Sequence, residues 1–275
     1  DVLTSRGLGD VYKRQNCDRE TAAVFELAGA VSERVHVNHF VNGERDLSEF
    51  HILAVPGGFS FGDHLGSGRL LGNRMRFAMR DQLTAFIEAG KPIIGICNGF
   101  QVLVKTGLLP GREIPDFEQR ASLTLNNSGR YEDRWVTLEF DPDSPCIWTK
   151  DITRIECPVR HGEGKFVMPS LSDLDSLHEN NQIVTRYVDP STEIGHGITD
   201  EPLPFPICPN GSIRNIAGIC DPTGLVFGLM PHPEAAYATF LHPHHTRADV
   251  NENILGECMQ TVSYTHLTLP TIVGV

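Results

Sequence analysis

The sequence lacks several features that mark well-defined classes of protein. No apolar run approaches the roughly 20 residues needed to span a bilayer, and the first residues lack the apolar core of a secretory signal. There is no run of Lys or Arg, and the formal net charge is −12 with a pI near 5.4. Such an acidic chain repels a phosphate backbone. We therefore expect neither a membrane nor a nucleic acid as a partner.

Paired cysteines are missing as well. The chain has seven cysteines, an odd number, and they are scattered without CxxC spacing. This pattern disfavours both a disulfide framework and a zinc site, so we expect reduced thiols, no metal and a cytoplasmic protein. The histidines in "HPHH" (242–245) could suggest a metal site, but the intervening proline breaks their spacing.

Strands and helices alternate in the first half of the chain. Residues 34–41 alternate apolar and polar, which predicts a strand, and a short buried strand opens the segment 50–68 before a Gly-rich loop. Four-residue apolar spacing then predicts a helix that ends at Gly90. The face that this helix would bury consists of Leu71, Met75, Met79, Leu83 and Ile87. A strand at 92–97 and a helix at 100–105 follow, which predicts a parallel sheet covered on both faces.

The second half of the chain is richer in strands. Strands are predicted at 134–140, 154–159 and 182–188, and the segment 215–234 reads as strand, turn, strand and loop. A last helix is expected over 248–262. The chain has 275 residues, 40% of them hydrophobic, and no dividing linker. We therefore expect a single α/β domain with a mostly parallel central sheet flanked by helices, and extra antiparallel strands in its second half.

The pentapeptide Gly95-Ile96-Cys97-Asn98-Gly99 has the pattern G-x-C-x-G, a nucleophile elbow with sulfur in place of oxygen. A nucleophile on a sharp strand-to-helix turn has strained backbone angles, and side chains at the flanking positions would collide with the neighbouring strand and helix. The turn would expose the sulfur at a helix N-terminus, which favours the thiolate. A buried core cysteine is the alternative, since free cysteine is often buried.

A general base for this thiol is predicted at His232. It follows an apolar strand in "GLMPHPEAA", where prolines on both sides keep the loop out of a helix. Residues two apart in an extended segment point the same way, so Glu234 could orient the imidazole toward the sulfur. A stiff surface loop is the alternative. The strand ends of a parallel sheet would bring Cys97, His232 and Glu234 to one edge.

An oxyanion hole is predicted beside them. The segment 56–68 has two adjacent glycines just after a strand, and a backbone so free of side chains can aim an N–H at a developing oxyanion. Gly58 and Asn98 are the candidate donors. The same loop could instead hold a phosphate, but it has neither of the spacings typical of nucleotide-binding loops.

Four segments together, "PGGFSFGD", "GICNGFQVL", "RHGEGKF" and "MPHPE", resemble the class I (triad) glutamine amidotransferases, in order and in spacing. "GGFSFGD" followed by "HGEGKF" is similar to the members that serve de novo purine synthesis. The resemblance covers about 16–262 and implies a flavodoxin-like amidotransferase fold over those residues.

The resemblance also implies a reaction and further site residues. Cys97 would attack the side-chain amide of glutamine, His232 would protonate the leaving ammonia, and water would hydrolyse the thioester. In the family, the glutamine after the elbow contacts the substrate, and here that position is Gln101. The "HGEG" loop would contact the amino-acid end of glutamine through His161 and Gly162. No metal or organic cofactor is implied in this chain.

Partners are implied as well. Ammonia would pass to a synthetase subunit, where ATP, with Mg, activates formylglycinamide ribonucleotide, and a small third subunit would bridge the two. The alternatives are an amidotransferase of another pathway, a Cys-His-Glu hydrolase of esters or peptides, and a binding module with a relic triad.

The two ends of the chain depart from the family pattern. Residues 1–15 and 263–275 resemble translated adapter sequence, and we expect both to be non-native flanks. The family opens with an apolar strand before the "NCDRE" stretch, and here that strand is missing or replaced. We expect its absence to expose two ladder edges of the sheet and to lower stability.

Overall fold

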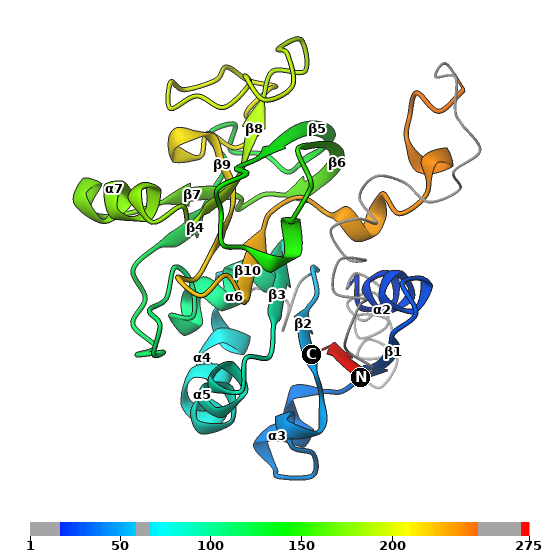
Figure 1. Ribbon diagram of the computed structural model, residues 1–275, viewed down its shortest axis with the longest axis vertical. Coiled ribbons are helices and arrows are strands. Elements are labelled where there is room, and N and C mark those ends of the chain that lie inside the picture. Colours follow the sequence, from blue (N-terminus) through cyan, green and yellow to red (C-terminus); the bar gives the residue numbers. More distant parts are fainter. Residues whose placement is uncertain (1–16, 59–65, 247–270, 275) are drawn as a thin grey trace, which may run out of the picture.

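The structure is a computed structural model that describes residues 17–58, 66–246 and 271–274. Its main element is a nine-stranded sheet in the order β1-β11-β2-β3-β10-β9-β8-β5-β6 (Figure 1). Its strands are β1 (Val31–Arg34), β2 (Ile52–Val55), β3 (Ile93–Ile96), β5 (Glu132–Phe140), β6 (Arg154–His161), β8 (Ile183–Val188), β9 (Ile216–Cys220), β10 (Val226–Leu229) and β11 (Thr271–Gly274). A second sheet pairs β4 (Ser122–Thr124) with β7 (Lys165–Val167).

The large sheet is divided by strand direction. The neighbours from β1 to β10 all pair in parallel, whereas β10, β9, β8, β5 and β6 pair antiparallel. This arrangement confirms the predicted parallel first half and antiparallel second half. The strands β2, β3 and β10 are buried along their whole length, as expected for parallel strands covered on both faces.

Helices cover the parallel strands. Figure 1 shows α2 on one side of them and α4, α5 and α6 on the other, where α6 contacts β3, β2 and β10. The helices are α2 (Asp18–Leu27), α3 (Val37–Val41), α4 (Arg69–Ala78), α5 (Arg80–Glu88), α6 (Asn98–Thr106) and α7 (Leu171–Glu179). Short 3-10 turns lie at η1 (Leu47–Glu49), η3 (Ile147–Thr149), η4 (Ile213–Asn215), η5 (Pro233–Ala235) and η6 (Thr239–Leu241). No helix among these described residues has the length and apolar character to cross a membrane.

Two predicted elements are corrected by the structure. The strand predicted at 34–41 is wrong, because β1 ends at Arg34 and α3 begins at Val37, whose apolar residues Val37 and Phe40 share one buried helical face. The side chain of His36 caps that helix by accepting from the N–H of Asn38. The long helix predicted up to Gly90 is two helices, α4 and α5, which meet at Met79.

The other predicted elements are confirmed, with one exception. The strands at 92–97, 134–140, 154–159 and 182–188 and the strand pair within 215–234 are all present, as are the first strand in 50–68 and the helix after Cys97. The apolar face predicted across α4 and α5 is fully buried. The helix predicted at 248–262 lies outside the described residues.

The strand β11 lies in the sheet between β1 and β2 (Figure 1). Thr271 pairs with Val31, and Ile272 pairs with Ile52, both in parallel register. The prediction that two ladder edges remain exposed is therefore wrong. β-branched residues such as those of "TIVG" suit a strand, and this segment supplies the ladder that β1 and β2 lack without it.

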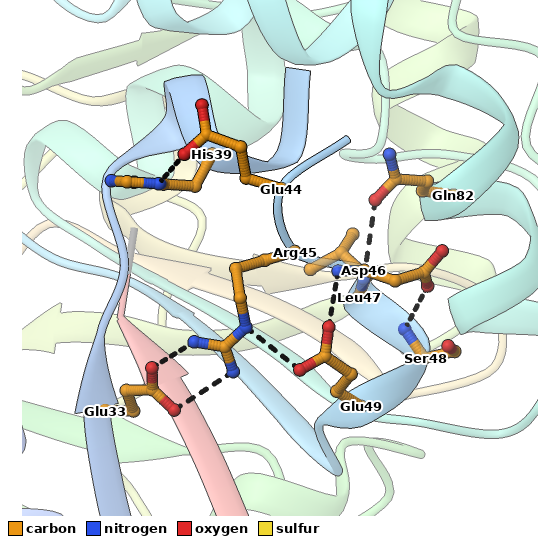
Figure 2. A network of polar contacts seen from close by, with 9 residues as sticks. All are labelled: Glu33, His39, Glu44, Arg45, Asp46, Leu47, Ser48, Glu49 and Gln82. Atoms are coloured by element: carbon orange, nitrogen blue, oxygen red, sulfur yellow. Dashed lines mark hydrogen bonds and ion pairs between the residues drawn. The ribbon is translucent and has the colours of Figure 1, made fainter. Parts of the chain in front are cut away.

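A network of hydrogen bonds and ion pairs stabilises the connection between β1 and β2 (Figure 2). The guanidinium of Arg45 binds the carboxylate of Glu33 on β1 and donates from Nε to Glu49 at 2.9 Å. Asp46 accepts from the N–H of Ser48 at 2.7 Å and completes a capping box with Glu49. These contacts fix the entry into β2, and the end of β2 carries the first glycines of the site.

Candidate active site

Cys97 lies at the turn between β3 and α6. Its backbone has φ 51° and ψ −104°, a strained conformation for a residue with a side chain. The N–H of Cys97 donates to the carbonyl of Leu229 on β10 at 2.8 Å, which joins the turn to the neighbouring strand. The strain predicted for a nucleophile elbow is thus present at this cysteine.

The glycines on both sides of Cys97 are required by space. A Cβ at Gly95 would lie 2.6 Å from Leu103 Cδ1 and 2.7 Å from the backbone of Gly99. A Cβ at Gly99 would lie 1.8 Å from the carbonyl oxygen of Val55 on β2. The first collision is with the following helix and the second is with the neighbouring strand, so the predicted reason for G-x-C-x-G is confirmed.

His232 and Glu234 follow β10 and form a buried pair. Nδ1 of His232 lies 2.6 Å from Oε1 of Glu234, and the two residues are 2% and 1% exposed. The N–H of His232 donates to the carbonyl of Pro158 on β6 at 2.8 Å. A Cβ at Gly57 would meet both the imidazole of His232 and the Cβ of Cys97, so these residues surround one point. The structure therefore brings the three predicted triad residues together.

The environment of His232 favours its protonated form. Burial lowers the pKa of His232, but the charge of Glu234, the electrostatic effect of Cys97 and hydrogen bonds with the sulfurs of Cys17 and Cys97 outweigh it and raise the pKa well above its usual value. An imidazolium held by Glu234 beside a sulfur can donate a proton to a leaving group. This arrangement is suited to acyl transfer by a cysteine.

The sulfur of Cys97 is enclosed rather than exposed. Only 6% of the residue is accessible, and Sγ lies 3.6 Å from the carbonyl oxygen of Arg160 on β6. Arg160 lies one residue before the end of β6, so the end of this strand lies against the sulfur. The predicted exposure is therefore wrong, and β6, a strand from the second half of the chain, contributes to the enclosure of the sulfur.

Cys17 is a neighbour of the triad that the sequence did not indicate. It precedes α2, and its Sγ lies 3.9 Å from Nδ1 of His232. Burial raises the pKa of this thiol more than its hydrogen bond with His232 lowers it. Ligand atoms of Cys17, His232 and Glu234 lie within 4.8 Å of one another, a spacing that a metal ion could use. Nδ1 of His232 is hydrogen-bonded to Glu234 at 2.6 Å, and we assign this pair to proton transfer.

The two predicted oxyanion donors follow β2 and Cys97. Gly58 has φ 124°, a conformation that favours glycine, and it stands next to Gly57, which borders Cys97 and His232. Asn98 is the first residue of α6, so its N–H belongs to the helix N-terminus, where the helix dipole favours negative charge. Both positions fit the predicted hole, and their role stays a prediction.

Gln101 is hydrogen-bonded to the "HGEG" segment. Nε2 of Gln101 donates to the carbonyl oxygen of Glu163 at 2.5 Å, and its Oε1 accepts from the side chain of Asn98 at 3.0 Å. His161 ends β6 and is 3% exposed, and Gly162 follows it. The three residues predicted to bind substrate thus lie in one connected region, and their contact with substrate stays a prediction.

Comparison with known proteins gives the class of the chain. Residues 12–261 match the family model of the CobB/CobQ-like glutamine amidotransferase domain. The chain belongs to this family of glutamine amidotransferases, as the elbow, the buried His-Glu pair and the sheet indicate.

Particular relatives are then found within this class. The chain is 45% identical over 228 residues to a protein of Dehalococcoides mccartyi named phosphoribosylformylglycinamidine synthase subunit PurQ, covering 83% of this chain and 84% of that relative. A PurQ of Treponema denticola is also 45% identical, covering 80% and 83%. Among solved structures, that of PurLQS from Thermotoga maritima superposes with a TM-score of 0.62 at 29% identity, covering 92% of each chain.

Proposed function

We propose that this chain hydrolyses glutamine to glutamate and ammonia through a thioester on Cys97. The observation that supports this most directly is a strained cysteine elbow beside a buried imidazole whose pKa is raised and whose Nδ1 is held by Glu234. The sulfur attacks the amide carbon of glutamine, and the carbon–nitrogen bond breaks as His232 transfers its proton to the leaving ammonia. Water then adds to the thioester, the carbon–sulfur bond breaks, and glutamate leaves with the proton balance restored through His232.

Donors to the developing oxyanion are assigned to the backbone. The N–H groups of Gly58 and Asn98 stabilise the tetrahedral intermediates, as expected for acyl transfer. Gln101, His161 and Gly162 hold the rest of the substrate. The chemistry needs only a nucleophile, a base with its orienting acid, and these donors, so we assign no metal or organic cofactor to this chain.

The chain acts as the glutaminase subunit of a phosphoribosylformylglycinamidine synthase. Similarity to proteins named PurQ, and to a chain in the structure of PurLQS, supports this place in purine biosynthesis. Ammonia passes to a synthetase subunit that converts formylglycinamide ribonucleotide to formylglycinamidine ribonucleotide with ATP and Mg on that partner. A small bridging subunit completes the complex, and we place the complex in the cytoplasm.

One experiment tests the reaction and the pathway together. Ammonia release from glutamine is measured for the purified chain, alone and with the synthetase and bridging subunits, ATP and formylglycinamide ribonucleotide. Because Cys97 is 6% exposed, we expect slow release by the isolated chain and fast release in the full mixture. Cys97→Ala should abolish release, while Cys146→Ala, at a buried cysteine under the turn after β5, should keep it.

Three outcomes would contradict parts of the proposal. Release by Cys97→Ala equal to wild type would end the mechanism. Cleavage of model esters without preference for glutamine would favour a general Cys-His-Glu hydrolase. Stimulation by the synthetase of another pathway, with none by this one, would assign the chain to a different amidotransferase complex.

A further inference from the structure

Asn126 is a buried residue, 3% exposed, that is hydrogen-bonded to the "HGEG" segment (161–164). Its backbone N–H donates to the carbonyl of Gly162 at 2.9 Å. Its side-chain Nδ2 donates to the carbonyls of His161 at 2.8 Å and Arg130 at 2.9 Å. Its Oδ1 accepts from the N–H of Gly164 at 3.0 Å and lies 3.1 Å from Nδ1 of His161. The side chain of Asn126 therefore contacts both ends of the "HGEG" segment, His161 and Gly164.

The contacts of Asn126 determine which nitrogen of His161 carries the proton. Carbonyl oxygens only accept, so the group of Asn126 that faces two of them is the amide NH2. The other group, which faces the N–H of Gly164, is then the amide oxygen, and an oxygen cannot donate. Nδ1 of His161 must therefore donate to it, and in a neutral imidazole the proton on Nδ1 leaves Nε2 as an acceptor.

Nε2 of His161 is buried, and within the described part of the chain it has no hydrogen-bond partner. Burial, followed by the charge of His232, lowers the pKa of His161 to about 4, so the ring is neutral near pH 7. Glu132, which is paired with His161 across β5 and β6, acts in the opposite direction. His161 lies near the triad, because the carbonyl oxygen of the preceding residue, Arg160, is 3.6 Å from Sγ of Cys97.

We propose that Asn126 is a positioning residue that fixes His161 as a hydrogen-bond acceptor, so that Nε2 receives an N–H of the bound substrate. A buried acceptor without a partner is costly, and a donor brought by the ligand removes that cost. Glutamine carries two candidate donors, the α-ammonium group and the side-chain amide. The identity of this donor rests on the glutaminase function proposed above, whereas the proton position of His161 does not.

The proton position is tested without any activity. Nitrogen-15 NMR of histidine-labelled protein, assigned with His161→Phe and with His196→Phe as a control in an exposed loop, reports whether Nε2 is protonated. We expect an unprotonated Nε2 at pH 7 that remains so down to about pH 5, because the pKa of His161 is about 4. A protonated Nε2 in the wild type at pH 7 would overturn the proposal, whatever the variants do.

Two substitutions at Asn126 have different expected effects. Asn126→Asp keeps an acceptor at Nδ1 and adds a negative charge, so it should raise the pKa of His161 and make KM for glutamine rise as pH falls below 7. Asn126→Leu removes the acceptor, so Nε2 should become protonated and KM should rise at every pH. A structural role alone would give the same loss in both variants with no change at Nε2, and that result would refute the proposal. If either variant fails to fold, the wild-type NMR spectrum and the variants at His161 still test the proposal.

The substrate donor is found by kinetics in the full complex. We expect His161→Phe to raise KM for glutamine roughly tenfold to a hundredfold, with a smaller change in kcat, and His161→Gln to restore part of the loss. The analogue 4-carbamoylbutanoate lacks the α-ammonium group. A rise for glutamine but not for the analogue identifies that ammonium as the donor, and an equal rise identifies the amide. An unchanged KM for both substrates would overturn the role of Nε2, while absence of glutamine hydrolysis in the wild type would overturn the proposed function instead.

Discussion

Replacing Gly99 by alanine should lower the free energy of unfolding, because the elbow has no space for a side chain at this position. An alanine inside a helix is normally about 1 kcal/mol more favourable than glycine. Here its Cβ would lie 1.8 Å from the carbonyl oxygen of Val55, where 3.4 Å is an ordinary contact, so α6 and β2 must separate by 1.6 Å. Overpacking a core typically costs about 1–3 kcal/mol, and a backbone carbonyl is less able to move than a side chain. We expect a net loss of about 2 kcal/mol in the free energy of unfolding, the upper end of the overpacking cost less the helix preference of alanine.

The measurement is urea unfolding of Gly99→Ala beside a matched helical glycine. Gly72 lies in α4, and a Cβ there would lie 3.0 Å from Cβ of Lys105 and 3.3 Å from the carbonyl oxygen of Val102, which are tight contacts but not a collision. Gly72→Ala should therefore cost much less than Gly99→Ala, because its neighbours need to move by only a few tenths of an ångström, and the slope of unfolding should be unchanged in both variants. The reasoning would be refuted if Gly99→Ala unfolded at the wild-type urea concentration, or if both alanines had equal effects.

Three further predictions concern the triad, the buried imidazole and the sheet. Glu234→Gln removes a negative charge that raises the pKa of His232, so the alkaline limb of glutaminase activity should move to lower pH and kcat should fall roughly a hundredfold; an unshifted limb would contradict this. The folded-state pKa of His161 is about 4 against a usual 6.5, so the unfolded chain binds the proton first as pH falls. Stability should therefore drop by about 3 kcal/mol between pH 7 and pH 4, a loss that His161→Phe abolishes in urea titrations at both pH values. Deleting 271–275 removes β11 and its pairings with β1 and β2. Each lost hydrogen bond is worth about 1 kcal/mol, so the urea midpoint should fall. An unchanged midpoint would show that β11 contributes nothing to the stability of the sheet.

The sequence predicted those parts of the site that depend on local pattern. Glycines two residues before and after Cys97 are a short-range signal, because the turn itself brings strand and helix together. The His-Pro-Glu order is likewise local, but the extended segment expected there is wrong. Pro233 begins the 3-10 turn η5 (Pro233–Ala235), and within that turn Glu234 reaches Nδ1 of His232. Alternating strands and helices then place both segments at one edge of the sheet.

Contacts between distant segments could not be predicted in this way. Cys17 reaches His232 across 215 positions, and Asn126 reaches His161 across 35, with no motif linking either pair. The contact of Cys97 with Arg160 on β6 joins residues 63 positions apart, and no local pattern indicates it. The strand predicted at 34–41 failed for a related reason: alternation over so few residues also fits the buried face of α3.

The position of β11 has a consequence for how the chain is made. Val31 pairs with Thr271, which the ribosome adds 240 positions later. At typical synthesis rates of about 5–20 residues per second, β1 and β2 wait on the order of tens of seconds before the strand between them exists. Pairings so distant along the chain also slow folding after release. A chain of this sequence therefore passes through a period in which two strand edges are open to other chains, and a chaperone that covers them would raise the yield of folded protein.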